Sequence, residues 1–576
     1  MSLAAAPAVV RLPVWRARFV LIAFVAGFAV LVGRSVYLQA MKTDFLQEKG
    51  EARFSRALEI PATRGRVLDR NGEALAVSTP VKSIWVIPAD VEASAQAKRR
   101  LAQLLGLDAR EVAKKLAETD RDFVYLKRQV SPDTAEKVDA LGIPGVYEQK
   151  EYRRYYPAGE VAAHVVGFTG VDDTGQEGIE LAYQSMLGGK PGSRRVIKDR
   201  LGRIVEDVGS VHAAQDGKDV TLSIDSKIQS LAYGALKDAV AAHHAKAGAI
   251  VAIDARTGEV LALANVPSYN PNNRARLTGS QLRNRALTDS FEPGSTLKPF
   301  SIALALETGR ITPATRLQTD GGKFRIGGYT IHDAHKDGML SVAQVIEVSS
   351  NVGAAKIALQ LPREQMWDMF RRVGFGAQPA LGFPGESGGK LRPWKTWRPI
   401  EQATMAYGHG IAVSLMQLAH AYTIFARDGR LVPLTLLRTD TPVQGERVIS
   451  AHTAHEVRKM LELAVQPGGT GPLARIMGWS VAGKTGTAHK EQDGGYAPDK
   501  YIASFAGFAP ASAPRVVLAV MIDEPDVRLD YYGGVVAAPV FAQVMQGILR
   551  MLNVPYDAPL EPLDAPGDGD AAKEGT

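Results

Sequence analysis

The sequence predicts an α+β fold over about residues 217–553, in which an antiparallel sheet is flanked by helices. Strand-like runs occur near residue 250 and again after residue 479, and helical segments fill the region between them. Strands at both ends of a region with helices between them favour one sheet that carries helices on its faces. A long apolar stretch near the N-terminus predicts one transmembrane helix, and a mixed α/β region follows it.

Length, composition and charge set the outer limits of this prediction. The chain has 576 residues, too many for one compact core, so we expect at least two folded regions. The net charge of +7 comes from basic residues spread along the chain. This spread disfavours a nucleic-acid partner and fits attraction to anionic lipids or to an acidic cell-wall polymer. The absence of cysteine excludes thiol catalysis, cysteine-based zinc sites and disulfides.

The apolar N-terminal segment is predicted to be a membrane anchor at residues 19–41. Residues 19–33 carry no charge, and apolar character resumes after Arg34, whose side chain can reach the head-group region. A cleaved signal peptide and a buried core helix are the alternatives, and Leu38-Gln39-Ala40 is a poor cleavage site. Only basic charges precede the segment, which places residues 1–18 in the cytoplasm and the rest outside the inner membrane; these charges are Arg11, Arg16 and Arg18.

Residues 42–216 are predicted to form a non-catalytic spacer, or pedestal, domain of mixed α/β structure. Short strand-like runs alternate with turn signals such as Asp69-Arg70-Asn71-Gly72, and Glu92–Leu105 is a charged helical stretch. This part of the sequence shows no grouping of a nucleophile with a base. At the other end of the chain, residues 554–576 carry four prolines among acidic residues and are predicted to be a disordered tail.

Six strand-like runs are predicted in the domain at residues 217–553. The first, Asp219–Asp225, alternates polar and apolar residues, and Lys227–Ala242 follows it as a helix. The next two flank Ala255-Arg256-Thr257-Gly258, a hairpin signal because glycine tolerates the positive φ of such a turn. The strands that flank this turn and the three later ones are Ala249–Asp254, Glu259–Ala264, Trp479–Ala488, Ile502–Phe508 and Arg515–Asp523.

Three short motifs in this domain carry residues suited to nucleophilic chemistry. Each is weak alone, because serine and lysine are common and chance matches occur at Ser387–Lys390 and Ser268–Asn270. All three in the same chain and in this order are a far rarer coincidence. The motifs are Ser295-Thr296-Leu297-Lys298, Ser349-Ser350-Asn351 and Lys484-Thr485-Gly486-Thr487.

Ser295 is the candidate nucleophile and Lys298 its candidate base. Ser295 opens an apolar helical run, and residues three apart share a helix face, so the Lys298 ammonium can reach the Ser295 hydroxyl. Pro299 is compatible with a first turn, whose amides lack intrahelical partners. Lysine accepts a proton only if its pKa falls far below ~10.4, through burial or a neighbouring cation such as Lys484. The competing Ser387 lies in a Gly- and Pro-rich stretch with no helical pattern.

Ser349 and Asn351 follow a predicted helix that begins with a capping box at Ser341 and Gln344. A hydroxyl held at the end of that helix can pass a proton to a leaving amine. The Asn351 amide can hydrogen-bond both Lys298 and a substrate amide. The alternative is an ordinary helix C-cap, because serine and asparagine are common there.

Residues 484–487 are predicted to form a strand that lies beside the substrate. Period-two alternation places Thr485 and Thr487 on one face, where their hydroxyls can hold a carboxylate, and directs Lys484 the other way, toward the serine–lysine network. Gly486 allows a substrate backbone to lie close to the strand and pair with it. The alternative is a solvent-facing lysine before a glycine bulge.

The three motifs resemble those of the penicillin-binding protein and serine β-lactamase superfamily. The surrounding sequence resembles class B penicillin-binding proteins, and most of all the division-specific (FtsI-type) transpeptidases of Gram-negative bacteria. The similarity runs from the anchor to about residue 553. The segments that carry it are Arg64-Gly65-Arg66, Asp69-Arg70-Asn71-Gly72, Arg154-Tyr155-Tyr156-Pro157, 267–272, 291–295, 349–353, 407–410 and 531–534.

The resemblance implies a serine β-lactamase/penicillin-binding transpeptidase-like fold and a two-step acyl transfer. Ser295 would attack the penultimate D-alanine carbonyl of a stem pentapeptide and release the terminal D-alanine. Backbone amides of Ser295 and Thr487 would form the oxyanion hole, and the amine of a second stem would take the acyl group. The resemblance implies no metal or cofactor. It implies β-lactams as covalent inhibitors, and a membrane-embedded glycan polymerase of the shape and division family and other division proteins as partners.

Other functions would differ from this one in recognisable features. A carboxypeptidase or β-lactamase would use Ser295, Lys298 and Lys484 but give the acyl group to water. A sensor would need a cytoplasmic signalling domain, which residues 1–18 are too few to form, and a purely structural protein would need none of the three motifs. Among transpeptidases, the elongation-specific class B type is the nearest alternative.

Overall fold

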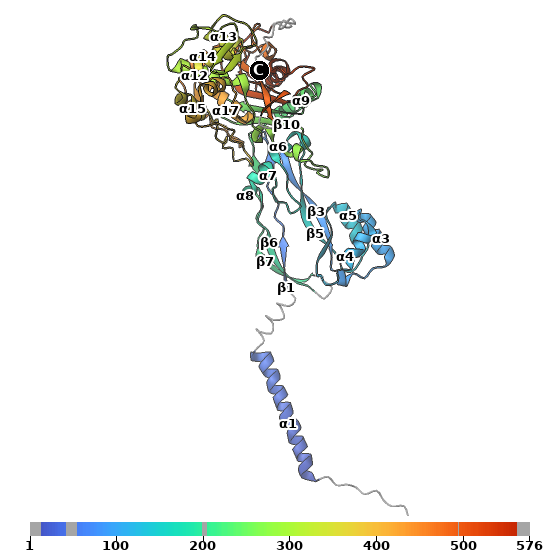
Figure 1. Cartoon of the computed structure of the whole chain (residues 1–576). Coiled ribbons are helices and arrows are strands. Elements are labelled where there is room, and N and C mark those ends of the chain that lie inside the picture. The colour runs from blue at the N-terminus through green and yellow to red at the C-terminus, as the bar shows by residue number, and fades with distance from the viewer. Residues whose placement is uncertain (1–12, 42–54, 199–203, 440, 493–494, 561–576) are drawn as a thin grey trace, which may run out of the picture. The chain divides into compact units, whose positions relative to one another are not determined.

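The computed structural model describes residues 13–41, 55–198, 204–439, 441–492 and 495–560. The chain divides into two compact units, and both are discontinuous in sequence (Figure 1). The first comprises residues 1–62, 81–151 and 190–215, and the second comprises 63–80, 152–189 and 216–576. The predicted boundary near residue 216 therefore differs from this division, in which two segments of the expected spacer group with the later residues.

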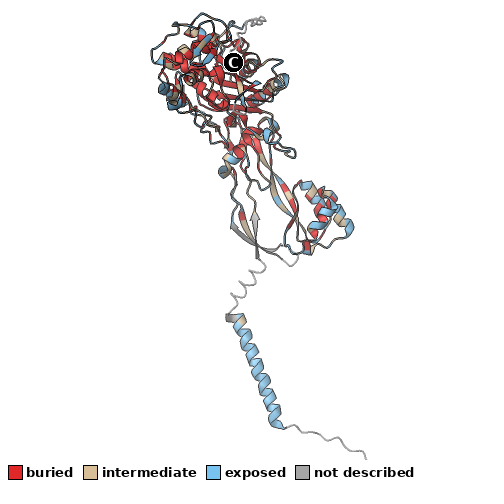
Figure 2. Cartoon of the chain, in the orientation of Figure 1, coloured by how far each residue is buried: buried red, intermediate tan, exposed pale blue. Residues whose placement is uncertain are grey.

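The predicted anchor is one long helix, α1 (Val14–Val36), which a π-helical turn continues through Tyr37–Met41. It begins at Val14 rather than Phe19, and none of its residues is buried, as the unbroken pale blue of α1 in Figure 2 shows. Val14–Gln39 is long and apolar enough to cross a membrane. Gly533–Met551 passes the same test of length and composition, but 56% of its apolar window is buried, as expected for a core helix.

The first unit contains two antiparallel sheet segments and a cluster of helices. One sheet has the strand order β1-β6-β7, and in the other residues 81–86 of β3 pair with β4. Helices α3, α4 and α5 supply buried residues such as Leu101, Val112 and Val138 to a core shared with β4. The bounds are β1 Ser55–Ile60, β3 Ala74–Val86, β4 Val124–Val130, β5 Val146–Tyr155, β6 Gly192–Lys198, β7 Ile204–His212, α3 Ala95–Leu105, α4 Ala109–Leu116 and α5 Pro132–Asp139.

The second unit is built on a five-stranded sheet with the order β10-β9-β19-β18-β17, and every neighbouring pair is antiparallel. This confirms the predicted α+β fold and its antiparallel sheet. The hairpin between β9 and β10 is also confirmed, with Gly258 at a φ of +75°. The bounds are β9 Ala247–Asp254, β10 Val260–Val266, β17 Ala482–Gln492, β18 Gly495–Ala509 and β19 Val516–Asp523.

Helices cover both faces of this sheet, because successive side chains of its central strands point to opposite faces and almost all of them are apolar. All eight residues of β9 and of β19 are buried. Ile250 of β9 packs with helices α9 (Ser226–Ala242) and α20 (Ala538–Met551), whereas its neighbour Val251 packs with α12 (Lys298–Glu307) and α17 (Leu415–Ala426). The other helices of this lobe are α13 Val342–Glu347, α14 Asn351–Ala358, α15 Arg363–Arg372, α16 Pro399–Met405, α18 Ala451–Leu463 and α19 Gly533–Val536.

The predicted strand Asp219–Asp225 is shortened in the structure. Only Val220–Thr221 (β8) forms a ladder, and it is parallel to β2 (Val67–Leu68). The chain then turns, because the Asp225 carboxylate accepts hydrogen bonds from the first amides of α9, at Lys227 and Ile228. The end of the segment with strand-like alternation therefore serves as the N-cap of a helix.

The prediction of disorder from Val554 onward is wrong for the segment up to Leu560. The Trp479 indole donates to the carbonyls of Val554 and Pro555, and its ring lies 4.5 Å from that of Tyr556. The carboxylate of Asp557 accepts from the Ser480 amide at 2.7 Å. Prolines prevent regular structure in this segment but not packing through its aromatic ring and carboxylate. Residues 561–576 of the predicted tail lie outside the described residues.

Candidate active site

Ser295 and Lys298 are held together by the turn that precedes α12. Residues Gly294–Leu297 form a 3-10 turn that leads directly into α12, so the predicted helix start is present but tighter than an α-helix. In 3-10 geometry residues three apart are eclipsed. The Lys298 Nζ atom accordingly lies 2.9 Å from the Ser295 Oγ atom, and both residues are buried. Pro299 lies in the first turn of α12, as predicted.

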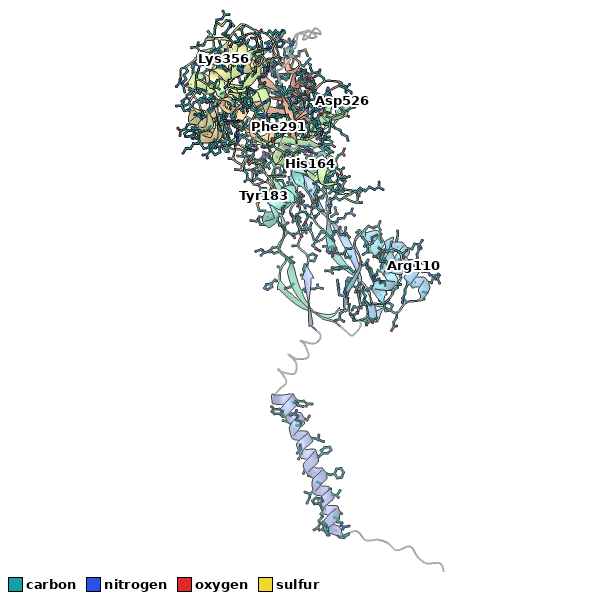
Figure 3. The ribbon with its side chains drawn as sticks, in the orientation of Figure 1. Arg110, His164, Tyr183, Phe291, Lys356 and Asp526 are labelled. Carbon is teal, nitrogen blue, oxygen red and sulfur yellow. The ribbon has the colours of Figure 1, made fainter. Side chains whose placement is uncertain are left out.

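The packed core of the second unit holds this turn in place. Phe300 of α12 packs edge-to-face against Tyr422 of α17 at 5.6 Å, and the Tyr422 hydroxyl donates to the Thr296 carbonyl at 2.8 Å. The strand-like residues before the turn pair at Phe291 with Val413. Figure 3 labels Phe291 among the densely packed side chains of this unit. Packing and hydrogen bonds therefore hold Ser295 in a fixed position, as a candidate nucleophile requires.

Ser349 brings a second hydroxyl to the same lysine. The Lys298 Nζ atom donates to the Ser349 Oγ at 2.8 Å and to the Ser349 carbonyl. Ser349 has a φ of +63°, in the left-handed region, between α13 and α14. A non-glycine residue held there costs about 1–3 kcal/mol of strain, which is typical of functional positions. The capping box at Ser341 and Gln344 is confirmed.

Asp333 fixes the start of α14, a role that the sequence did not indicate. Its carboxylate accepts from the Ser350 hydroxyl at 2.6 Å and from the Val352 amide at 2.9 Å. The neighbouring His332 carbonyl accepts from the Asn351 side-chain amide at 3.1 Å. Asp333 is 16 residues before Ser349, and only the fold brings it to this helix end. The predicted hydrogen bond between Asn351 and Lys298 stays a prediction.

The site also includes β17, which is the edge strand of the sheet and carries residues 484–487. The prediction that Lys484 points away from the threonine hydroxyls is wrong, because its Nζ atom donates to the Thr485 Oγ1 at 3.0 Å. The same atom donates to the Thr470 Oγ1, also at 3.0 Å. A long side chain can fold back along its strand where oxygens gather around its ammonium. The Thr487 Oγ1 accepts from the Gly533 amide at 3.0 Å.

Gly486 brings β17 against the turn that carries Ser295. A Cβ atom at this position would lie 2.7 Å from the Pro293 carbonyl and 2.5 Å from the Ser504 Oγ, distances that side chains do not adopt. Glycine is therefore required by packing inside the protein, in addition to any approach of a substrate. On the other side of this contact, a Cβ atom at Gly294 would lie 3.1 Å from the Thr487 carbonyl.

Buried ionisable groups around the site are held in defined states. His409 is buried, and burial chiefly lowers the pKa of its imidazole to about 4, so the ring is neutral at pH 7. Burial raises the pKa of the Glu292 carboxyl above its usual value. The Glu292 carboxylate accepts from the Gly410 amide at 2.6 Å and from the Tyr496 hydroxyl at 2.9 Å. Glu292 thus ties the serine turn to the β17–β18 hairpin.

The two chance motifs lie apart from this arrangement. The Ser387 hydroxyl accepts from the Gly389 amide, and Lys390 is exposed. The Ser268 hydroxyl donates to the Glu160 carbonyl, and the Asn270 side chain accepts from the Asn272 amide. These are ordinary loop contacts. Among the residues that the structure describes, no group of three or more metal-ligating side chains occurs.

Comparison with known proteins decides the family. Residues 248–546 match the family described as "Penicillin binding protein transpeptidase domain", and residues 59–222 match the "Penicillin-binding Protein dimerisation domain". The chain is 45% identical over 554 residues to the "Probable peptidoglycan D,D-transpeptidase PenA" of Neisseria gonorrhoeae, an alignment that covers 96% of this chain and 94% of the relative.

The chain belongs to the penicillin-binding protein transpeptidase family. Another relative, the "Peptidoglycan D,D-transpeptidase FtsI" of Escherichia coli K12, is 41% identical over 94% of this chain and 93% of its own. Among solved structures, the transpeptidase domain of Burkholderia pseudomallei penicillin-binding protein 3 is 50% identical over 59% of this chain and 98% of its own, with a TM-score of 0.55. Penicillin-binding protein 3 of Mycobacterium tuberculosis, complexed with aztreonam, is 29% identical over 88% of this chain and 100% of its own, with a TM-score of 0.68.

Membership of this family agrees with the class B architecture, in which a second domain precedes the transpeptidase domain. It also agrees with the fold predicted from the sequence. Sequence reasoning did not find Thr470, Asp333 or the role of Glu292. Asp333 and Thr470 stand outside the three motifs, and no local pattern distinguishes them from other loop residues.

Proposed function

We propose that this penicillin-binding protein is a serine-type peptidoglycan D,D-transpeptidase that cross-links stem peptides of the septal wall. One observation carries the proposal: the buried Lys298 Nζ atom lies within hydrogen-bonding distance of two serine hydroxyls, those of Ser295 and Ser349. A lysine away from water favours its neutral form, and a neutral amine beside a hydroxyl is a base that can activate it. The names of the relatives state the same reaction.

In the first step, Ser295 Oγ attacks the carbonyl carbon of the penultimate D-alanine while neutral Lys298 takes the hydroxyl proton. The carbonyl oxygen becomes an oxyanion, for which the backbone amides of Ser295 and Thr487 are the proposed donors. The intermediate then expels the amine of the terminal D-alanine. Ser349, which bonds to Lys298, passes the proton to that amine, so that free D-alanine leaves and a Ser295 ester remains.

In the second step, the amine of another stem peptide attacks the ester carbonyl. Its proton returns through Ser349 and Lys298 to Ser295, and a new peptide bond forms as the serine is released. Before acylation, Thr485, Gly486 and Thr487 on the edge strand hold the donor stem, with Lys484 close to the carboxylate of its terminal D-alanine, and Asn351 holds an amide of the substrate. None of these steps uses a metal or a cofactor.

Transfer to an amine, rather than to water, is favoured by the state of the nearby carboxylates. A hydrolase needs a base that activates water against the ester. Glu292 and Asp333, the carboxylates described beside the motifs, each accept two hydrogen bonds from protein groups. These bonds tie both carboxylates to the scaffold and leave them poorly placed to take a proton from water.

A penicillin adduct on this protein is therefore expected to persist for many minutes or longer. The drug supplies no acceptor amine, and its ring blocks the approach of one, so turnover should fall far below the ~1–10³ per second usual for an enzyme on its substrate. Intact-mass spectrometry after a chase with excess unlabelled protein would follow the adduct. Loss of the adduct within seconds, with catalytic accumulation of hydrolysed drug, would assign the protein to the hydrolases instead.

The septal role rests on the similarity to FtsI, and elongation-specific class B enzymes are the alternative. Depletion of the protein is expected to give long filaments, because cells that grow but cannot close the septum keep elongating. Phase-contrast microscopy during depletion measures this directly. Round cells would show that the protein acts in elongation.

Helix α1 fits a single-pass anchor in the inner membrane, with the N-terminus in the cytoplasm and the catalytic unit in the periplasm. The basic residues before the helix and the periplasmic location of the substrate support this orientation. A membrane-embedded glycan polymerase of the shape and division family, together with other division proteins, is the proposed set of partners. β-Lactams are the proposed covalent inhibitors.

A further inference from the structure

Thr470 lies in the loop after α18, outside all three motifs, and the structure holds it tightly. Its side chain is 2% exposed. A Cβ atom at the next residue, Gly471, would lie 3.0 Å from the Phe505 ring and 3.3 Å from the Thr485 methyl group. A Cβ atom at Gly534 would lie 2.2 Å from the Thr470 carbonyl. Close packing on both sides therefore holds the backbone at Thr470 in place.

That hydroxyl joins the ammonium of Lys484 to the hydroxyl of Thr485. The Thr470 Oγ1 accepts from the Lys484 Nζ at 3.0 Å and lies 2.7 Å from the Thr485 Oγ1. The Thr485 Oγ1 accepts from the same Nζ at 3.0 Å. The three polar atoms form a closed triangle, and all three residues are buried.

The number of protons in the triangle restricts the directions in which its hydrogen bonds can run. The ammonium can only donate, so both hydroxyl oxygens serve it as acceptors. The short contact between the two hydroxyls uses the proton of one of them. If Thr470 donates, the Thr485 proton can be directed out of the triangle, and two donors polarise that hydroxyl into a stronger donor.

We propose that Thr470 is a positioning residue that orients the Thr485 hydroxyl proton toward the terminal carboxylate of the donor substrate. It contacts neither the reacting carbonyl nor the nucleophile. Its effect is on recognition of the carboxylate through Thr485 and Lys484. This inference rests on the proposed function, because it assumes that the donor peptide or a β-lactam acylates Ser295.

The test compares acylation of the full-length protein by a penicillin and by the methyl ester of the same penicillin, which carries no negative charge. The ratio of the two second-order acylation rates measures recognition of the carboxylate. In Thr470→Val, an isosteric change that removes the hydroxyl, the ratio is expected to fall about tenfold, as for loss of one charge-assisted hydrogen bond. Thr470→Ser is expected to restore most of the ratio.

A matched control is Thr423→Val, because Thr423 is also fully buried but its hydroxyl bonds to the His420 carbonyl within α17. It is expected to leave the ratio unchanged. Thr470→Ala, which cannot clash, replaces Thr470→Val if that variant does not fold. An equal loss for both compounds, an unchanged ratio, or a serine variant that behaves like valine would overturn the inference. Absence of acylation in the unmutated protein would instead refute the proposed function.

Discussion

Replacement of Ser295 by alanine is expected to abolish labelling by a fluorescent penicillin, a loss of at least about a thousandfold in acylation rate. The reason is direct, because the attacking Oγ atom is removed. Ser349, which also contacts Lys298, lies between α13 and α14, on a segment separate from the turn that carries Ser295. Gel fluorescence at a fixed time measures the labelled fraction.

The chain provides its own control for this experiment. Ser387→Ala alters the other Ser-x-x-Lys sequence, whose serine accepts a bond from a loop amide and whose Lys390 is exposed. It should be labelled like the unmutated protein. Thermal unfolding of both variants should be unchanged within a few degrees, because one hydroxyl is removed in each. Label retained on Ser295→Ala would show that another residue is the nucleophile.

Replacement of Lys298 by methionine is expected to lower the acylation rate by about 10²–10⁴-fold, the range for loss of a general base. Methionine is unbranched and only one atom shorter than lysine, so it fills most of the fully buried space that alanine would leave empty. The acylation rate should be measured by stopped-flow or intact mass over a range of penicillin concentrations. A true base affects the chemical step and leaves the affinity of the first, non-covalent complex nearly unchanged.

Lys390→Met is the corresponding control, since that lysine is exposed and lies in the chance motif. An acylation rate for Lys298→Met within a few-fold of the unmutated protein would assign the role of base to another group. A large loss of apparent affinity with an unchanged maximal rate would make Lys298 a binding residue.

Much of the catalytic unit could be predicted because its signals are local. The continuous apolar runs of β9 and β19 follow directly from burial on both faces, and the capping box at Ser341 and Gln344 is a sequence pattern. The motifs identified Ser295 and Lys298 because three-residue spacing has a fixed meaning at a helix start. The structure places these two side chains 2.9 Å apart.

What could not be predicted depends on contacts between distant residues. Thr470 reaches Lys484 across 14 residues, and Asp333 reaches Ser350 across 17. The segment Val554–Leu560 has a composition typical of disorder, yet Tyr556 and Asp557 bind to Trp479 and Ser480. The amino-acid composition likewise does not indicate that the two units are interleaved along the chain. Local patterns specify elements, whereas these features depend on how the elements are brought together.

The strand order of the catalytic sheet also has a consequence for how the protein is made. β19 lies between β9 and β18, so Val251 pairs with Ala519, a residue synthesised long after it. A nascent chain that has reached residue 500 already contains Ser295, Lys298 and Lys484, but it lacks the strand that joins β18 and β17 to the rest of the sheet. Ser295 therefore gains its full structural setting only after Asp523 has been synthesised. A nascent chain is therefore expected to resist acylation until nearly all of its polypeptide has been made and the sheet can close.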